Sequence, residues 1–363
     1  MDRKALIAMS GGVDSSVTAY LMKKEGYSCT GITMKLFSNE DANVVNERTC
    51  CSLKDSADAA SVAASLGIPY YVLDFREEFN EKIIHKFIEC YETGRTPNPC
   101  IDCNRYMKFG RLFAKARELG ADHVATGHYA RIKQDEASGR WLLKKSADKL
   151  KDQTYVLYSL TQEQLAHTVF PLGGMTKDRT REIAEEHGFV NAKKHDSQDI
   201  CFVVDGDYAK FIEGYSGQTF PEGDFIDMDG NVLGRHKGLI RYTIGQRKGL
   251  GLALPQPMYV VSKSIPDNTV TLGLEKDLLS SSLTAEDLNW ISVESLPDEG
   301  IRCSAVTRYH KREQPCLVKP DPEDPGRAVV TFDEPQRAVT PGQAVVFYDG
   351  DIVVGGGTIT ASK

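Results

Sequence analysis

The sequence lacks any long apolar run. Its apolar stretches are short and broken by charged residues, whereas a helix that crosses a membrane needs about 20 consecutive apolar residues. The first residues, Met1-Asp2-Arg3-Lys4, lead directly into a strand-like segment and lack the pattern of a secretory signal. We therefore expect a cytoplasmic protein with no membrane partner.

Acidic residues are missing from one long stretch of the chain. Between Gly230 and Ile265 there is no Asp or Glu, although six basic residues lie there: Arg235, Lys237, Arg241, Arg247, Lys248 and Lys263. The net charge of −7 argues against a nucleic-acid partner, but salt screens charges beyond about 8–10 Å, so the local sign matters more. A second basic group comprises Arg308, His310, Lys311 and Arg312. With Tyr242 and Tyr309 interleaved, the two tracts suit a phosphate backbone better than an ordinary solvated surface.

The nine cysteines do not indicate a disulfide framework, because a reducing cytoplasm keeps thiols reduced. Cys29 and Cys90 have apolar neighbours and are expected to be packing residues. Cys303 and Cys316 are expected to be inert. Burial is the simplest account of Cys50-Cys51. Cys100, Cys103 and Cys201 remain to be explained by chemistry.

The first two hundred residues alternate strands with helices. Strands are expected at 5–9, 29–34, 70–74 and 123–126, and helices at 14–24 and 56–66. Two further helical faces are formed by Phe79, Ile83, Phe87 and Tyr91, and by Phe109, Leu112, Phe113, Ala116 and Leu119. This rhythm predicts an α/β domain built on a doubly wound parallel sheet with helices on both faces.

After about His195 the helical periodicity fades and short β-rich runs with Gly and Pro take over. Strands are expected at 258–262 and 269–272, and then at 303–307, 328–332, 344–348 and 352–354. The length of 363 residues exceeds what one core usually organises. We predict a catalytic domain at 1–196, a small, mostly β central domain at 197–276, and a C-terminal β-barrel at 277–363, for which a β-sandwich is the alternative.

A glycine-rich segment, Ser10-Gly11-Gly12-Val13-Asp14-Ser15-Ser16, joins the first strand to the first helix. The glycines let the backbone approach a phosphate, and the helix that follows presents unpaired N–H groups. Ser15 and Ser16 add hydroxyl donors, and Asp14 is a candidate magnesium ligand. No Lys follows the glycines as in a Walker motif, so the γ-phosphate is not the expected target. The alternative is a tight turn whose Ser and Asp cap the helix.

This segment resembles the signature of the N-type ATP pyrophosphatases, the PP-loop family, which cleave ATP to AMP and pyrophosphate. The resemblance implies an adenine nucleotide α-hydrolase-like fold. It also implies that ATP, with Mg²⁺, is bound by Ala8, Met9, Ser10, Gly11, Gly12, Val13, Asp14, Ser15, Ser16, Met34 and Gly127.

Other segments of the sequence limit which molecule can be the acceptor of the AMP group. They are 96–104, with Pro97 and Pro99 stiffening the loop before Cys100 and Cys103, then 126–131, 151–153, 196–202, 245–249 and 340–343. Together they resemble the tRNA-specific 2-thiouridylases over essentially the whole chain. The resemblance implies that the substrate is the wobble uridine (U34) of Lys, Glu and Gln tRNAs.

The chemistry of uracil explains this set. Its C2 carbonyl is a poor electrophile, so adenylation of the oxygen creates a leaving group that a sulfur nucleophile expels. The resemblance implies that Cys201 carries the sulfur as a persulfide, supplied by a cysteine desulfurase or a sulfur-carrier protein. It implies that Cys103 acts as acid/base or nucleophile and releases sulfur through a Cys103–Cys201 disulfide. The alternative is two unrelated buried thiols.

The resemblance also implies two groups of contacts with the substrate. Asn98, Pro99 and Cys100 would contact the target base. The tRNA itself would be contacted by His128, Lys151, Asp152, Gln153, Arg308, Tyr309 and Gln343. For His128 a hydrogen-bonded structural role is the alternative, and for Lys151 a solvated surface role.

Cys100 departs from many members of the family, which have Asp at this position. Cys100, Cys103 and Cys201 would supply three thiolates, enough to hold an iron–sulfur cluster with one open iron. The alternative is that Cys100 has no part in the reaction.

Three rival functions stay open at this stage. One is another PP-loop enzyme that modifies tRNA, such as a lysidine- or 4-thiouridine-forming enzyme, which the cysteine loop and C-terminal barrel fit less well. The second is an amidating ligase, although no glutaminase segment is recognisable. The third is a non-catalytic tRNA- or cluster-binding protein.

Overall fold

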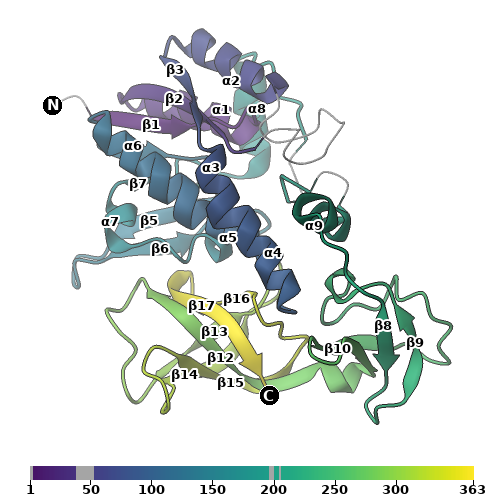
Figure 1. Cartoon of the computed structure of the whole chain (residues 1–363). Coiled ribbons are helices and arrows are strands. Elements are labelled where there is room, and N and C mark those ends of the chain that lie inside the picture. The colour runs from purple at the N-terminus through teal and green to yellow at the C-terminus, as the bar shows by residue number, and fades with distance from the viewer. Residues whose placement is uncertain (1–2, 38–52, 196–199, 204–205) are drawn as a thin grey trace. The chain divides into compact units, whose positions relative to one another are not determined.

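The computed structural model describes residues 3–37, 53–195, 200–203 and 206–363 (Figure 1). The chain divides into two compact units. The first comprises Met1–Ile84, Pro99–Gly206 and Gly350–Val354, and the second comprises His85–Asn98, Asp207–Asp349 and Gly355–Lys363. Among the described residues, no helix has the length and apolar character needed to cross a membrane. Cys50 and Cys51, for which burial was expected, lie outside the described residues.

The first unit is built on a five-stranded sheet of order β3-β2-β1-β4-β7, in which all neighbours are parallel. Its strands are β1 (Lys4–Ala8), β2 (Ser28–Lys35), β3 (Tyr70–Asp74), β4 (His123–Ala125) and β7 (Thr168–Val169). Strand order reverses at β1, so a topological switch point lies between the carboxyl ends of β1 and β4. Ligands of open α/β sheets bind at such points.

Helices connect these strands. They are α1 (Val13–Lys24), α2 (Leu53–Leu66), α3 (Arg76–Phe79), η1 (Asn80–Ile84), α5 (Pro99–Asp102), η2 (Cys103–Arg111), α6 (Leu112–Glu118), η3 (Thr154–Val156), α7 (Gln162–Ala166) and α8 (Lys177–Glu186). The unit also holds a hairpin, β5 (Ala130–Gln134) and β6 (Trp141–Lys145), that the sequence pattern did not indicate.

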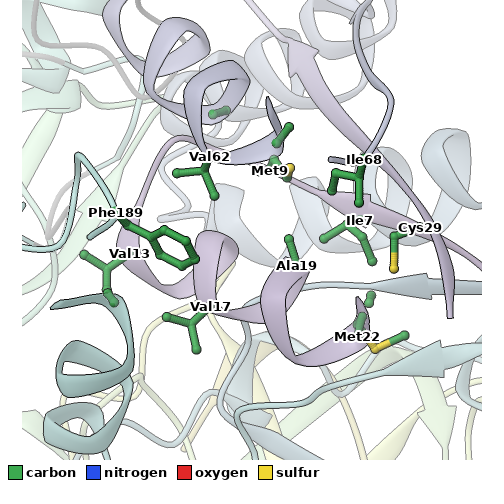
Figure 2. Close-up of a cluster of buried hydrophobic side chains, with 14 of the residues drawn as sticks. Ile7, Met9, Val13, Val17, Ala19, Met22, Cys29, Val62, Ile68 and Phe189 are labelled. Carbon is green, nitrogen blue, oxygen red and sulfur yellow. The ribbon is translucent and has the colours of Figure 1, made fainter. Parts of the chain in front are cut away.

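Both faces of the sheet are covered, as alternation along β1 shows. Ala5, Ile7 and Met9 point to one face and pack with residues of α1, α2 and α8 (Figure 2). Leu6 points to the other face and packs with Leu112 and Ala116 of α6. Successive side chains of a strand point to opposite faces, so a strand covered on both sides is apolar throughout. The predicted doubly wound parallel sheet is thus confirmed.

The central part of the second unit carries α4 (His85–Glu92), α9 (Tyr208–Ser216) and a four-stranded sheet of order β10-β11-β8-β9. The strands are β8 (Gly223–Ile226), β9 (Val232–His236), β10 (Tyr259–Ser264) and β11 (Thr269–Gly273), with η4 (Leu239–Arg241) after β9. Phe225, Tyr242, Val260, Val270 and Leu272 form its core. Tyr242, which lies among the basic residues of the 230–265 tract in the sequence, is therefore buried in this core.

A closed barrel completes the second unit. Its order is β12-β15-β14-β13-β16-β17, and β17 pairs back with β12. Its elements are η5 (Glu275–Leu278), β12 (Leu279–Trp290), β13 (Ile301–Val306), β14 (Gln314–Pro320), β15 (Ala328–Arg337), β16 (Ala344–Asp349) and β17 (Ile352–Ser362). The predicted C-terminal barrel is confirmed. The predicted domain boundaries at 196 and 277 remain predictions.

Burial within the sheet gives a prediction about stability. Val124 on β4 has no exposed surface, whereas Val72 on β3 is 49% exposed. Val124→Ala should lower the free energy of unfolding by about 2 kcal/mol, because it removes two buried methyl groups and leaves a cavity. The matched change Val72→Ala should stay within about 0.5 kcal/mol. Urea denaturation of both variants measures this, and equal losses would contradict the packing described.

Candidate active site

The glycine-rich segment forms a tight loop between β1 and α1. Gly11 has φ +71°, which favours glycine, and a Cβ there would lie 2.2 Å from the carbonyl oxygen of Asp55. The N-terminal residue of α1 is preceded by Gly12, and no side chain caps this end. The first N–H groups of α1 therefore lie at the carboxyl edge of the sheet without a cap, which is the arrangement that binds phosphate.

The hydroxyl groups of Ser15 and Ser16 form hydrogen bonds within the loop itself. Ser15 Oγ and Ser16 Oγ both donate to the Gly12 carbonyl, at 3.0 and 3.1 Å. The Ser10 backbone N–H donates to Ser15 Oγ at 3.2 Å. Ser15 and Ser16 are buried, so their hydroxyls shape the loop, and the backbone N–H groups remain as the donors for a ligand.

The Asp14 carboxylate accepts hydrogen bonds from two residues that were not predicted as site residues. Lys177 Nζ donates to both Asp14 carboxylate oxygens at 2.8 Å, and Tyr129 Oη donates to one of them at 2.9 Å. Lys177 is itself buried, and its backbone N–H donates to Asp148. A carboxylate paired in this way does not fit a magnesium ligand. Among the described residues, no group of three His, Cys, Asp or Glu has the geometry to hold a metal ion.

Two residues far along the chain, Asn191 and Lys194, form hydrogen bonds with the glycine-rich loop. Asn191 Nδ2 donates to the Gly11 carbonyl and to Ser16 Oγ, both at 2.9 Å. Lys194 Nζ donates to the same carbonyl at 3.0 Å and pairs with Asp55 and Asp58 of α2. Neither residue belongs to a motif, and a single sequence offers no spacing signal that would have found them.

The segment after β4 lies directly against the loop. A Cβ on Gly127 would be 2.9 Å from the Asp14 carbonyl carbon and 3.0 Å from the Ser15 nitrogen, so only glycine fits there. Met34 lies on β2, the neighbour of β1 on the other side. The predicted ATP-binding residues of β1, the loop, β2 and β4 thus share the carboxyl edge of one sheet.

Cys100 and Cys103 lie on a helical run that begins with Pro99, the favoured residue at a first helical position. Cys100 is exposed in α5 and Cys103 is half-buried at the first residue of η2, a π-helical segment. Cys201 is half-buried, and the next residue, Phe202, packs on Phe79 with ring centroids 5.8 Å apart. All three thiols belong to the first unit. They form no metal-ligating group in the described structure, so the residues do not fit an iron–sulfur cluster in this arrangement.

Three of the residues predicted to contact tRNA form hydrogen bonds with the protein backbone. The carboxylate of Asp152 accepts hydrogen bonds from Ser146 and Thr154, and burial raises its pKa. Gln153 Oε1 accepts from the Tyr129 N–H at 2.9 Å. Gln343 is buried and its Nε2 donates to the carbonyls of Thr96 and Pro97, at 2.8 and 3.1 Å. Gln343 therefore supports the segment that leads to Asn98.

His128 is also buried. Its Nδ1 lies 2.7 Å from Thr126 Oγ1, and its Nε2 lies 3.4 Å from Lys108 Nζ. Burial, aided by the Lys108 charge, holds the pKa of His128 well below its usual range, so the ring is neutral near pH 7.

The basic tracts differ in how much of their charge is balanced. Arg235 pairs with Asp224 and Arg241 pairs with Glu213, so acidic residues from outside the tract neutralise both. Burial lowers the pKa of Lys263 to about 8. Arg308 is exposed. Lys311, three residues on, has its pKa lowered by burial and by the charges of Arg308 and Arg337. Arg308 is therefore an exposed positive charge on the barrel.

Comparison with known proteins identifies the family. Residues 3–205 match a family described as the tRNA methyl transferase HUP domain, 209–274 its PRC-barrel domain, and 280–359 an aminomethyltransferase β-barrel domain. The tRNA-specific 2-thiouridylase MnmA of Clostridioides difficile (strain 630) is 53% identical over 100% of this chain and 99% of its own length. The protein of the same name from Acetivibrio thermocellus is 51% identical, covering 98% and 99%.

The chain belongs to the tRNA-specific 2-thiouridylase family. The resemblance inferred from the motifs is confirmed, and with it the three-part fold. Membership in this PP-loop family supports ATP binding.

The close approach of Gly127 yields a prediction about nucleotide binding. Gly127→Ala should weaken binding of a non-hydrolysable ATP analogue by about tenfold or more, a loss of about 1.4 kcal/mol, because the new methyl group displaces the start of α1. Gly174→Ala is the matched control, since a Cβ there meets nothing within 4 Å. Isothermal titration measures both. Unchanged affinity in the Gly127 variant would mean that this edge does not hold the nucleotide.

Proposed function

We propose that this protein is a tRNA-uridine 2-sulfurtransferase that uses ATP to convert the wobble uridine of Lys, Glu and Gln tRNAs to 2-thiouridine. The observation that carries the proposal is the uncapped start of α1 at the switch point of the sheet, in the same unit as Cys103 and Cys201. Full-length relatives about half identical to this chain carry the name of that activity.

The first half of the proposed reaction is adenylation. The uracil C2 oxygen attacks the α-phosphorus of ATP, and pyrophosphate leaves. The N–H groups at the start of α1 stabilise the charge that develops on the phosphates. Gly11 and Gly127 allow the backbone approach that this needs. The fixed Asp14–Lys177 pair keeps the loop in place while the phosphates change.

The second half is sulfur transfer. The terminal sulfur of a persulfide on Cys201 attacks C2, and AMP leaves. Cys103 then attacks the Sγ of Cys201, which forms the Cys103–Cys201 disulfide and leaves the sulfur on the base as 2-thiouridine. A thiol reductant restores both cysteines before a persulfide donor, a cysteine desulfurase or a sulfur carrier, reloads Cys201. Asn98, Pro99 and Cys100 hold the base. The carbonyls of Thr96 and Pro97, which precede them in the chain, accept hydrogen bonds from Gln343.

Substitution of Cys201 tests the division between the two halves. Cys201→Ser should abolish 2-thiouridine formation while leaving tRNA-dependent pyrophosphate release within about threefold, because adenylation needs no thiol. The half-buried Cys303→Ser on the barrel is the matched control and should retain both activities. Mass spectrometry of the tRNA and a pyrophosphate assay measure the two steps. Release of pyrophosphate without tRNA, or triggered by a small acid, would favour an amidating ligase instead.

The Cys100→Ser variant distinguishes a reaction through a persulfide from a reaction through an iron–sulfur cluster. By the persulfide route it should retain thiolation within about tenfold, and protein purified without oxygen should be colourless and iron-free. Loss of thiolation together with bound iron and visible absorbance would establish the cluster route. The same tRNA assay on cells that lack the protein should show loss of 2-thiouridine at the wobble position.

Substitution of Arg308 tests whether the barrel contributes to the proposed tRNA surface. Arg308→Ala should weaken tRNA binding and reduce the slope of log affinity against log salt by about 1, because one phosphate contact releases about one counterion. Arg302→Ala is the control, since its guanidinium already pairs with Asp333 at 2.7 Å. Binding titrations at several salt concentrations measure the slopes. Equal slopes for both variants would remove Arg308 from the tRNA surface.

A further inference from the structure

Lys108 lies one turn from Cys103 on the same helical segment. The segment η2 runs Cys103–Arg111 and is π-helical. In a π-helix the hydrogen bonds join residues five apart, so Cys103 and Lys108 lie on the same side of the segment. π-helical turns are rare and are concentrated at functional sites. An α-helix would place the two residues on different sides.

The Lys108 ammonium is held by a neutral imidazole. Its Nζ lies 3.4 Å from His128 Nε2, and His128 Nδ1 lies 2.7 Å from Thr126 Oγ1. An ammonium group only donates, so Nε2 must be the acceptor and the ring proton must lie on Nδ1, toward Thr126. The chain Thr126–His128–Lys108 therefore fixes both the ring and the ammonium group. His128 is 7% exposed, which leaves little room for either to rotate.

This ammonium group has no counter-charge within the described residues. Its one polar contact there is the neutral His128 ring, and no carboxylate forms an ion pair with it. The cations at the loop differ, because Lys177 pairs with Asp14, and Lys194 with Asp55 and Asp58. Lys108 is half-buried. A half-buried cation without a carboxylate retains most of its attraction for an anion.

The position of Lys108 indicates which anion it meets. His128 directly follows Gly127, where an added Cβ would lie within 3.0 Å of Asp14 and Ser15 at the start of α1. Five residues before Lys108 is Cys103, and Cys100 precedes it on the adjoining α5. The residues around Lys108 thus connect the phosphate-binding end of α1 with the helix that carries the thiols. In the proposed reaction, the group that passes between these two places is the α-phosphate.

We propose that Lys108 binds the α-phosphate of ATP and stays with it through its transfer to the uracil C2 oxygen and its departure as AMP. The inference rests on the proposed function. Lys108 supplies from η2 the positive charge that the loop, having no lysine of its own, lacks. His128 is its positioning residue and acts from the interior of the first unit.

Lys108→Met tests the assignment. It should lower kcat for tRNA-dependent pyrophosphate release about 100-fold, with the KM for ATP changed less than about threefold, because the contact strengthens as charge develops in the transition state. Lys108→Arg should restore kcat to within about tenfold. Lys115→Met on α6, whose ammonium pairs with Glu118 at the surface, is the matched control and should match the wild type. Lys108→Gln gives the same comparison should the methionine variant fail to fold.

A thio-substitution experiment distinguishes contact from a structural role. ATPαS carries sulfur in place of one α-phosphate oxygen, and one of its two diastereomers places that sulfur toward Lys108. The wild type should react more slowly with that diastereomer than with ATP, and this ratio should shrink toward one in Lys108→Met. The ratio for the other diastereomer should not change. A merely structural lysine would leave both ratios as in the wild type.

The outcomes separate this inference from the proposed function. Wild-type protein that releases no pyrophosphate with tRNA would overturn both. Wild-type activity with a Lys108→Met variant whose kcat falls less than threefold, or with unchanged thio ratios in that variant, would overturn the Lys108 assignment alone.

Discussion

The exposed N-terminal end of α1 is the constraint on which the rest of the first unit depends. An uncapped helix start at the edge of a parallel sheet leaves N–H groups without a side-chain partner, and a bound anion can accept their hydrogen bonds. Gly11 and Gly127 hold the backbone against this end, because neither position has room for a methyl group. Asn191, Lys177 and Lys194 then fix the loop through Gly11, Ser16, Asp14 and α2.

The lysines near this edge of the sheet differ in whether a carboxylate partner balances their charge. Lys177 and Lys194 form ion pairs with carboxylates of the first unit, so their charge stabilises the fold. Lys108 contacts a neutral ring instead, so its charge remains for a ligand. His128, read from the motif as a tRNA contact, is buried. A buried polar group of this kind can orient a charged neighbour.

Two features of the second unit show that a sequence motif does not by itself reveal the role of its residues. Gln343 belongs to a motif of the family, and its amide holds the carbonyls of Thr96 and Pro97. A motif records that a residue is needed, but not whether it meets the ligand or supports the backbone that does. The basic tract at 230–265 makes the same point, since acidic partners outside it neutralise Arg235 and Arg241 and its Tyr242 packs in the core.

The sequence by itself determined the parallel sheet, the barrel, the nucleotide loop and the family, because these depend on local periodicity and on residues adjacent in the chain. Strand β3, predicted at 70–74, has those bounds in the structure. Only the tertiary structure decided which residues complete the site. Lys177 and Lys194 reach the loop from 163 and 183 positions along the chain. Lys108 lies on the π-helical segment η2, which no sequence pattern predicts, and its Nζ contacts His128 Nε2. Contacts between distant residues arise from packing, and packing leaves no regular spacing in a single sequence.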